Sequence, residues 1–312
     1  MLIFAAKSFI MTGKKDFDVI IIGGSYAGLS AAMALGRSLR QVLIIDSGKP
    51  CNRQTPHSHN FLTQDGETPL AIRNKAKAQV LNYPTVHFLE ADVINANKLK
   101  QCFTVETDQG EVFFAKKILF TTGVKDLMPA IEGFAACWGI SVLHCPYCHG
   151  YEVHGKKIGL LGNGDVGYEF CKLISNWSKD LVLFTNGKST LTPEQTQKIK
   201  SKNIEIVEKE MLRLEHQQGL IQNLVFTDQS TYAIAAMFAR VAFEQHCQLP
   251  EALGCFLTEQ GFIQVDDFQK TTVPGIYAAG DNTTMFRTLS TAIASGTKAG
   301  AVLNKELIDE EF

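Results

Sequence analysis

The sequence predicts an α/β protein that contains two copies of the strand, glycine turn and helix unit that binds dinucleotides. An apolar run leads into a glycine-rich turn and a small-residue helix soon after residue 16, and the same order returns near residue 156. Another apolar strand follows each helix, as a βαβ unit requires. With 312 residues, the chain has the length of roughly two domains.

The composition is that of an ordinary globular protein, with 45% hydrophobic and 20% charged residues. Thirty basic side chains against 32 acidic ones give a formal net charge of −2, so no positive field favours nucleic acid or an anionic membrane. No apolar run approaches the ~18 residues of a membrane span. We therefore expect neither nucleic acid nor a membrane as a partner.

The first residues predict an N-terminal extension, 1–15, that is not part of the fold. Its apolar start is ended by Lys7 before it reaches the length of a signal peptide, and no small-residue cleavage site follows. We therefore expect a cytoplasmic protein. In that reducing compartment the eight cysteines do not predict a disulfide scaffold, and a close cysteine pair indicates metal, haem or redox chemistry.

The first nucleotide unit combines a strand over 17–22 with the turn Gly23-Gly24-Ser25-Tyr26-Ala27-Gly28 and a helix over 29–39. Small residues permit the tight turn, and the helix N-terminus offers N–H groups to a pyrophosphate. Ser25 replaces the middle glycine of G-x-G-x-x-G, a change that a small side chain tolerates. The next strand, 42–45, ends at Asp46, whose carboxylate is placed to accept hydrogen bonds from a ribose.

The second unit repeats this order with a strand over 156–161, a helix over 168–177 and a strand over 181–184. Its turn satisfies G-x-G-x-x-G through Gly162, Gly164 and Gly167. Where the first unit has its aspartate, this one has Thr185-Asn186-Gly187, so it lacks both a carboxylate for a ribose and an arginine for a 2′-phosphate.

The remaining predicted elements lie between and after the two units. A hairpin turn, Asp108-Gln109-Gly110, separates two strands, and a capping box at Thr192 starts a helix. A buried-type strand leads into Thr121-Thr122-Gly123, and a later short strand leads into Gly280-Asp281. The predicted ranges are 102–107, 111–114, 117–120 and 275–278 for strands, and 290–310 for the last helix.

The hexapeptide His144-Cys145-Pro146-Tyr147-Cys148-His149 is the candidate reactive motif, and it has four interpretations. Haem attachment through C-x-x-C-H requires export, for which no signal is visible. A zinc site is poorly served by adjacent His-Cys pairs without a second C-x-x-C, so we expect no metal. A thioredoxin-like motif belongs near the start of a small βαβ domain, whereas this one lies between two nucleotide units. The fourth interpretation, favoured here, is a dithiol that exchanges electrons with a bound flavin.

The spacing suits that dithiol chemistry. Cys145 and Cys148 can close a disulfide, and the second cysteine can lose its proton where a helix N-terminus or a positive ring stabilises the thiolate. His149 titrates near neutrality and is placed to pass a proton to or from the dithiol.

Taken together, these motifs resemble the low-molecular-weight thioredoxin reductase family from about Asp16 to the C-terminus. Their order is the family's: a glycine-rich flavin unit, a Thr-Gly motif, C-x-x-C, a second glycine-rich unit and a C-terminal Gly-Asp. The resemblance implies two Rossmann-like domains in a homodimer. An FAD domain, discontinuous over 16–124 and 248–312, would hold an inserted domain, 125–247, with the pyridine nucleotide and the dithiol.

The resemblance also implies roles for individual residues. Gly23 to Gly28 would hold the FAD pyrophosphate, Cys148 would face the flavin, and Cys145 would exchange with the substrate sulfur. The other FAD contacts that it implies are Asp46 at the adenosine ribose, Val93 at the adenine edge, Asn60 beside the flavin, Thr122 and Gly123 at the cleft, and Asp281, after Gly280, at the ribityl chain.

Departures from the family pattern place the chain near a divergent branch. His149 stands where the family has its acid–base aspartate, and Thr185-Asn186-Gly187 replaces the His-Arg-Arg tract that selects NADPH. Leu191 aligns with a further arginine of that tract. The extension His149-Gly150-Tyr151-Glu152 is similar to fungal dithiol oxidases of the gliotoxin type and to reductases that use donors such as ferredoxin.

Three functions follow from these interpretations. The first is an FAD-dependent disulfide oxidoreductase that acts on a thioredoxin-like protein or a small-molecule disulfide, with Gly162, Gly164 and Gly167 as the pyridine nucleotide site. The second is a flavin dithiol oxidase that passes electrons to O₂, or a reductase with a donor other than NADPH. The third is a non-catalytic flavin redox sensor.

Overall fold

The structure is a computed structural model that describes residues 16–312, and the predicted extension, 1–15, lies outside them. The chain separates into two compact units. The first combines the described residues up to Gly48 with Lys77–Gly123 and Cys247–Phe312, and the second combines Lys49–Ala76 with Val124–His246. The first unit is thus assembled from segments far apart in the sequence. The domain bounds predicted above stay a prediction, and segment 49–76, assigned there to the FAD domain, groups here with the second unit.

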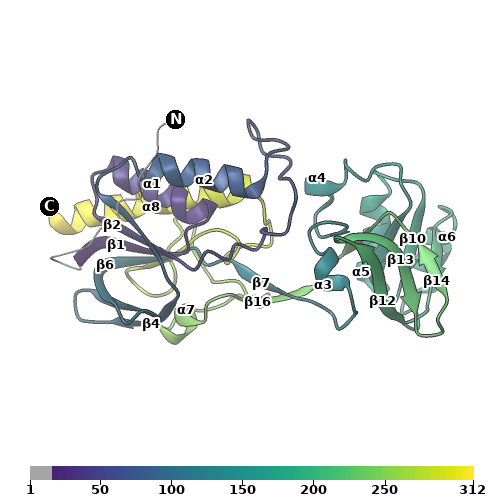
Figure 1. Cartoon of the computed structure of the whole chain (residues 1–312). Coiled ribbons are helices and arrows are strands. Elements are labelled where there is room, and N and C mark those ends of the chain that lie inside the picture. Colours follow the sequence, from purple (N-terminus) through teal and green to yellow (C-terminus); the bar gives the residue numbers. More distant parts are fainter. Residues whose placement is uncertain (1–15) are drawn as a thin grey trace, which may run out of the picture. The chain divides into compact units, whose positions relative to one another are not determined.

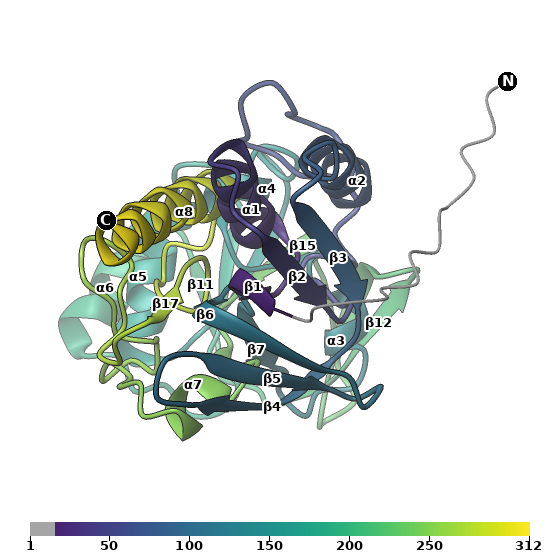
Figure 2. The same ribbon diagram turned by 90° about the vertical axis from the view of Figure 1, so that its left-hand side faces the viewer.

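The first unit is built on a seven-stranded sheet of order β3-β2-β1-β6-β5-β4, in which β17 also pairs with β6 (Figure 1). Strands β3, β2, β1, β6 and β17 run parallel, whereas β5 is antiparallel to β4 and β6. Figure 2 shows β2, β1 and β6 side by side in this sheet. The elements are β1 (Asp16–Ile22), α1 (Tyr26–Arg37), β2 (Val42–Asp46), β3 (Val86–Glu90), β4 (Val93–Lys98), β5 (Phe103–Thr107), β6 (Val112–Phe120), α7 (Leu249–Ala252), β17 (Ile276–Ala278) and α8 (Leu289–Glu311). Helix α2 (Pro69–Val80) crosses the boundary between the two units, which falls after Ala76.

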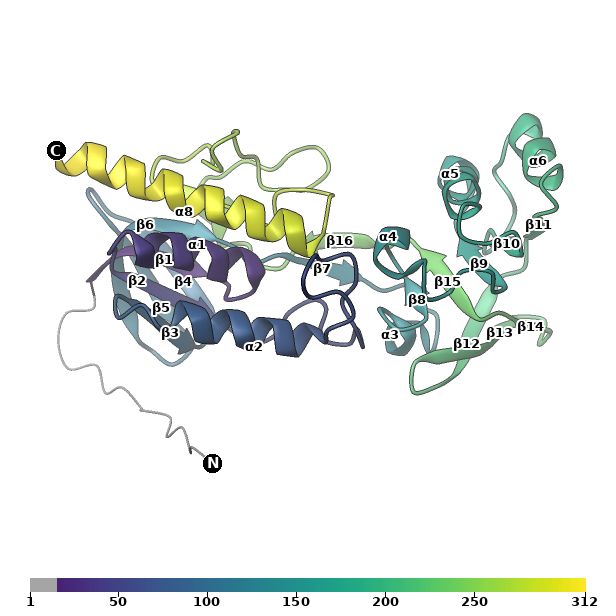
Figure 3. The ribbon, with the colours of Figure 1, turned by 90° about the horizontal axis from the view of Figure 1, so that it is seen from above.

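Helices α1 and α8 lie side by side on one face of this sheet (Figure 3). Their backbones approach closely because both carry small residues: a Cβ added to Gly296 would lie 2.1 Å from the Ala27 oxygen, and one added to Gly300 would lie 2.7 Å from the Ala31 oxygen. Val19, Ile20 and Ile21 of β1 are fully buried, as expected for a central parallel strand. This packing fixes the first glycine turn between β1 and α1.

The second unit contains a parallel five-stranded sheet of order β11-β10-β9-β15-β8, a three-stranded sheet, β12-β13-β14, and the pair β7 and β16. Helix α5 packs on β9 and β10, and its buried face includes Phe170 and Ile174. The elements are β7 (Val124–Leu127), α3 (Phe134–Cys137), β8 (Val142–Leu143), α4 (Pro146–His149), β9 (Ile158–Leu161), α5 (Gly164–Ile174), β10 (Leu181–Phe184), α6 (Pro193–Lys200), β11 (Glu205–Val207), β12 (Met211–Gln217), β13 (Leu220–Phe226), β14 (Thr231–Ala233), β15 (Ala236–Ala239) and β16 (Ala242–Gln245).

The predicted fold class is confirmed, and so are both βαβ units, the capping box at Thr192 and the C-terminal helix. The predicted strands 111–114 and 117–120 were wrong as separate elements, since β6 runs unbroken through both. Its first half alternates in burial beside antiparallel β5 and its second half is buried beside β1 and β17, so one strand changes its pattern when its neighbours change. Within residues 16–312, no helix has both the length and the apolar character to cross a membrane.

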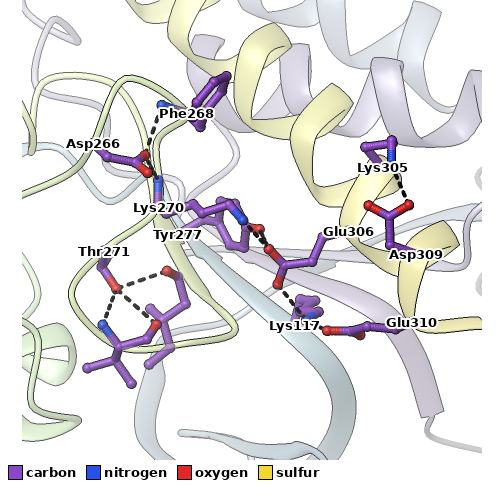
Figure 4. Close-up of polar contacts among 12 residues, drawn as sticks. Lys117, Asp266, Phe268, Lys270, Thr271, Tyr277, Lys305, Glu306, Asp309 and Glu310 are labelled. Atoms are coloured by element: carbon purple, nitrogen blue, oxygen red, sulfur yellow. Dashed lines mark hydrogen bonds and ion pairs between the residues drawn. The ribbon is translucent and has the colours of Figure 1, made fainter.

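An ion-pair network fastens α8 to the sheet (Figure 4). Lys117 of β6 is buried, and its Nζ lies 2.7 Å from Oε1 of Glu306 and 2.5 Å from Oε1 of Glu310. Glu306 Oε2 also accepts hydrogen bonds from Lys270 and Tyr277, each at 2.5 Å. Burial favours the neutral form of Glu306, but these donors prevail and lower the pKa of its carboxyl to about 2.

We expect Lys117→Met to lower the free energy of unfolding by about 2 kcal/mol, because Glu306 and Glu310 lose their buried cation while Lys270 and Tyr277 remain. Since the pKa of Glu306 is depressed in the folded state, its stabilising effect is present above its ordinary pKa near 4.3 and is lost as the pH falls toward 2. Urea unfolding at pH 7 and at lower pH measures both effects. Lys305→Met, which removes an exposed pair with Asp309 on the same helix, is the matched control and should cost about 0.5 kcal/mol or less. Equal stabilities of the two variants would contradict the prediction.

Candidate functional site

The first glycine turn lies at the edge of the sheet where four parallel strands end. Ile22 pairs in register with Ile45 of β2 and Phe120 of β6, and Phe120 pairs with Ala278 of β17. The residues that follow these strands therefore gather at one edge. They include most of the predicted FAD contacts: Gly23 to Gly28, Asp46, Thr122, Gly123, Gly280 and Asp281.

The turn forms a backbone cradle that requires glycine at positions 23 and 28. Gly23 has φ +108°, and a Cβ added to Gly28 would lie 2.0 Å from the Gly23 oxygen. Thr121 donates a hydrogen bond of 2.6 Å from its hydroxyl to the Gly23 oxygen, so the end of β6 is tied to the turn. Ser25 is the N-cap of α1, and its side chain makes no capping hydrogen bond. The serine thus stands at the start of α1 without capping it.

Asp46 is held at this edge by backbone donors. Its Oδ1 accepts a hydrogen bond of 2.8 Å from the Gly24 N–H, and its Oδ2 accepts one of 3.2 Å from the Gly48 N–H. Its carbonyl accepts a hydrogen bond from the N–H of Ala91, which precedes the first residue of β4, Val93, by two positions. Asp46 and Val93, predicted for the ribose and the adenine, therefore lie near each other and near the turn.

The same edge also contains a buried side-chain hydroxyl group. Thr122 Oγ1 is buried and has no hydrogen-bond partner among the described residues. Gly280, at φ +93°, donates a hydrogen bond of 3.1 Å to Ser295 of α8, and the Asp281 carboxylate lies 3.7 Å from Nε of Arg287. An orphan hydroxyl beside a glycine cradle and two aspartates fits a bound dinucleotide with ribose and pyrophosphate groups.

The dithiol lies on α4 of the second unit. Cys145 is the N-cap and Pro146 follows at the first helical position, which orders a single helical turn. That turn brings the Cys145 and Cys148 sulfurs to 2.8 Å from each other, with the Cys148 thiol as donor. Both side chains are partly exposed. The pair is thus placed for disulfide exchange.

Local hydrogen bonds make Cys145 an acidic thiol. The hydrogen bond from the Cys148 thiol, aided by the N–H groups of Cys148 and Tyr147, lowers the pKa of Cys145 to about 7 against the opposing effect of burial. The sequence interpretation placed a stabilised thiolate at the second cysteine. The lowered pKa of Cys145 favours a thiolate at the first cysteine, and the thiolate at the second cysteine stays a prediction.

We expect the alkylation rate of reduced Cys145 by iodoacetamide to rise with a midpoint near pH 7, because only the thiolate reacts. In Cys148→Ala the main donor is lost, so the midpoint should rise by about one pH unit. Mass spectrometry of the peptide over a pH series measures both midpoints, with glutathione as an ordinary thiol for comparison. A midpoint near that of glutathione in the unmodified protein would contradict the assignment.

His149 lies in a polar cluster that sequence reasoning missed. Its ring packs perpendicular to that of His59, with centroids 6.2 Å apart, and His59 Nε2 lies 3.5 Å from Oε1 of Glu152. Burial lowers the pKa of His149, the Glu152 charge opposes this shift, and His59 adds to it. His149 is therefore neutral near pH 7 and able to accept a proton. His59 precedes Asn60 in a polar loop, and no pattern in the sequence connected that loop with the dithiol.

Asn60 is the predicted FAD contact that belongs to the second unit and not to the first. It has φ +58°, and its N–H donates a hydrogen bond of 2.7 Å to Oδ1 of Asp65. Its role beside the flavin stays a prediction. Among residues 16–312, no group of three or more His, Cys, Asp or Glu side chains is arranged to hold a metal ion.

The second glycine turn has the expected backbone but a different polar lining. A Cβ added to Gly167 would lie 2.8 Å from the Gly162 oxygen, and Gly164 has φ +53°. The Asn163 side-chain oxygen accepts hydrogen bonds from the Gly164 N–H at 2.9 Å and from the Thr190 N–H at 2.8 Å. The turn is thus close-packed like the first, while a protein amide already engages its first helical N–H.

At the edge of this second turn the positions that carry arginines in the family pattern have none, and the nearby cation is Lys188, whose carbonyl accepts a hydrogen bond of 2.9 Å from the Asn163 side chain. Thr185 is buried, and its hydroxyl donates a hydrogen bond of 2.6 Å to the Gly187 oxygen. Leu191, where the family pattern has an arginine, packs against the core of the second unit. At the positions that the family pattern uses for NADPH, the side chains of this protein therefore stabilise the loop itself.

The chain is similar to known proteins over nearly its whole length. Residues 17–296 match the family described as pyridine nucleotide-disulphide oxidoreductase. The chain is 30% identical to thioredoxin reductase tcpT of Claviceps purpurea, with 96% of each chain covered, and 29% identical to thioredoxin reductase sirT of Leptosphaeria maculans, with 95% and 96% covered. Among solved structures it is similar to TrxB of Bacillus anthracis, with TM-score 0.91, 32% identity, and 95% of this chain and 100% of that chain covered.

Each of these relatives is matched over nearly its whole length, so the similarity includes both nucleotide-type units and the dithiol between them. The resemblance to thioredoxin reductases drawn from the motif order is confirmed. The chain belongs to the pyridine nucleotide-disulphide oxidoreductase family, as a thioredoxin reductase-like oxidoreductase.

Proposed function

We propose that the protein is an FAD-dependent thiol–disulfide oxidoreductase in which Cys145 and Cys148 carry electrons between a sulfur substrate and the flavin. The observation that carries the proposal is the dithiol: two sulfurs 2.8 Å apart, one with its pKa lowered to about 7. A thiolate available at neutral pH beside a second thiol is the arrangement that disulfide exchange requires.

The glycine cradle and its neighbours would hold FAD. Gly23, Gly24 and Gly28 would approach the pyrophosphate, Asp46 the adenosine ribose and Val93 the adenine, and the unpartnered hydroxyl of Thr122 would gain a hydrogen bond at the cofactor. Asp281 would bind the ribityl chain. FAD supplies a two-electron acceptor and donor for the dithiol.

Cys145 is the residue that exchanges with the substrate. In the oxidising direction a substrate thiolate attacks the Cys145–Cys148 disulfide, and a second substrate thiol then displaces Cys145 to leave a substrate disulfide and two enzyme thiols. In the reducing direction the Cys145 thiolate attacks the substrate disulfide, and Cys148 resolves the mixed disulfide. The lowered pKa of Cys145 favours it both as nucleophile and as leaving group.

His149 is the base of this chemistry. It follows Cys148 on the same helical turn, and its lowered pKa keeps the imidazole neutral near pH 7. It can therefore take the proton of the Cys148 thiol and return it in the opposite direction.

A second candidate concerns the electron partner, and the second glycine turn favours it. Asn163 engages the Gly164 N–H and Thr185 bonds within its own loop, so the first helical donor is occupied, and the cation beside the turn is Lys188 and not an arginine. This supports a dithiol oxidase that passes electrons to O₂, or a reductase with a donor other than NADPH. The sulfur substrate is a thioredoxin-like protein or a small dithiol, and the proposal includes a cytoplasmic homodimer.

An anaerobic titration of the FAD-loaded protein tests these proposals. Dithiothreitol should bleach the flavin absorbance through Cys145 and Cys148, and an unbleached flavin would overturn the proposed function. Parallel titrations with NADPH and NADH separate the two electron partners. Bleaching by a nicotinamide nucleotide would favour the reductase, and bleaching by dithiol alone would favour the oxidase or another donor. Light scattering of the same sample measures whether the chain is a dimer.

A further inference from the structure

One carboxylate in the second unit faces two imidazoles beside the dithiol. Glu152 Oε1 lies 3.5 Å from His59 Nε2, and Glu152 also interacts electrostatically with His149, three residues earlier. The two rings pack edge to face with an interplanar angle of 88°. The Glu152 charge favours the charged form of His149, and the neighbouring His59 opposes it.

The other titratable groups around this cluster lie at its two ends. On α4, Cys148 and Cys145 adjoin His149. On the 49–76 segment, the His57 ring lies 6.4 Å from the His59 ring, and Asp65 Oδ1 lies 3.8 Å from His59 Nδ1. Asp65 is 69% exposed and His59 only 22%, so Asp65 faces solvent and contributes little beside Glu152.

We propose that Glu152 and His59 are positioning residues that set the proton affinity of His149 in opposite directions, an inference that rests on the proposed function of the dithiol. When the S–H bond of Cys148 breaks, its electron pair stays on sulfur and a new N–H bond forms on His149. Glu152 stabilises the imidazolium formed in this step. His59 opposes that stabilisation, because its ring lies against that of His149 and disfavours a positive charge there.

The variants of the two residues are expected to move His149 in opposite directions. Glu152→Gln removes the stabilising charge and should lower the pKa of His149 by about half a unit or more. His59→Gln removes the imidazole that opposes a charge on His149 and should raise the pKa of His149 by about half a unit. Glu152→Asp retains the charge and should restore most of the shift. If the two residues had purely structural roles, their variants would not shift the pKa of His149 in opposite directions.

Histidine labelled with ¹³C at Cε1 lets these pKa values be measured by NMR in the FAD-loaded protein, with His149→Asn to assign the resonance. Glu169→Gln and His154→Gln are matched controls, because both are exposed residues of the same unit outside the cluster. They should leave the His149 titration unchanged. Shifts of the same sign in Glu152→Gln and His59→Gln, or no shift in either, would overturn the proposal.

Anaerobic stopped-flow reduction by dithiothreitol then tests whether the chemistry uses this proton affinity. The pH at which the rate rises should move down in Glu152→Gln and up in His59→Gln, with a three- to tenfold slower rate for Glu152→Gln at pH 7. If both variants keep the unmodified profile while dithiothreitol still bleaches the flavin, the inference fails and the proposed function stands. If the unmodified protein itself is not bleached, the proposed function fails and this inference fails with it.

Discussion

Replacing either Cys145 or Cys148 with serine will slow the reduction of bound flavin by dithiols at least 10³-fold, a loss of about 4 kcal/mol in transition-state stabilisation. The structure places the two sulfurs 2.8 Å apart on one helical turn, so no other cysteine pair in the described residues can replace them at this site. Serine has nearly the size of cysteine, but its hydroxyl neither ionises near pH 7 nor forms a disulfide. The expected loss is therefore chemical and not a consequence of altered packing.

Anaerobic stopped-flow mixing with dithiothreitol measures this rate directly. Cys51→Ser is the matched control, since Cys51 is an exposed cysteine of the same unit, and it should retain the unmodified rate. Retention of more than a tenth of the rate in either dithiol variant would contradict the assignment of the dithiol as the electron carrier.

The two serine variants should also differ from each other. In Cys148→Ser the Cys145 thiolate remains and should form a stable mixed disulfide with an aromatic disulfide reagent at pH 7. In Cys145→Ser the thiol with the lowered pKa is gone, and the same reagent should react at least tenfold more slowly. Equal rates would mean that the substrate-facing thiol is not Cys145.

The sequence predicted the parts of the fold that have a strong local signal. The βαβ units were recognisable because buried parallel strands appear as continuous apolar runs, and their turns require glycine. The short strands β7, β8 and β16 went unpredicted, because their pairing depends on segments distant in the sequence. Helix α2 was not predicted either.

The site divides in the same way. Cys145, Cys148 and His149 belong to one short motif, so the sequence itself places them close together. His59 and Glu152 are 93 residues apart, and only the docking of segment 49–76 in the second unit makes them neighbours. The lowered pKa of Cys145 was likewise invisible in the sequence, because it depends on the hydrogen bonds that its sulfur receives in the first helical turn.

Gly28→Ala will weaken FAD binding at least 100-fold and lower the free energy of unfolding by about 3 kcal/mol. A Cβ at this position would lie 2.0 Å from the Gly23 oxygen and 2.8 Å from the Thr121 hydroxyl oxygen, so the backbone of the turn must move. Moving it breaks the 2.6 Å hydrogen bond by which Thr121 ties β6 to the turn. Overpacking of a rigid backbone contact has a cost of this size, and the pyrophosphate depends on the displaced atoms.

Flavin absorbance per mole of purified protein, followed by titration of the apoprotein with FAD, measures the affinity, and urea unfolding measures the stability. Gly110→Ala separates a general loss of stability from a defect in the cradle: Gly110 has φ +77° in a hairpin of the same unit, but a Cβ there meets no atom within 4 Å. This control should cost about 1 kcal/mol through backbone strain and keep its FAD affinity. If Gly28→Ala binds FAD as tightly as Gly110→Ala does, the pyrophosphate does not lie on the turn between β1 and α1, because no cofactor seated there could tolerate the movement that the added methyl group forces.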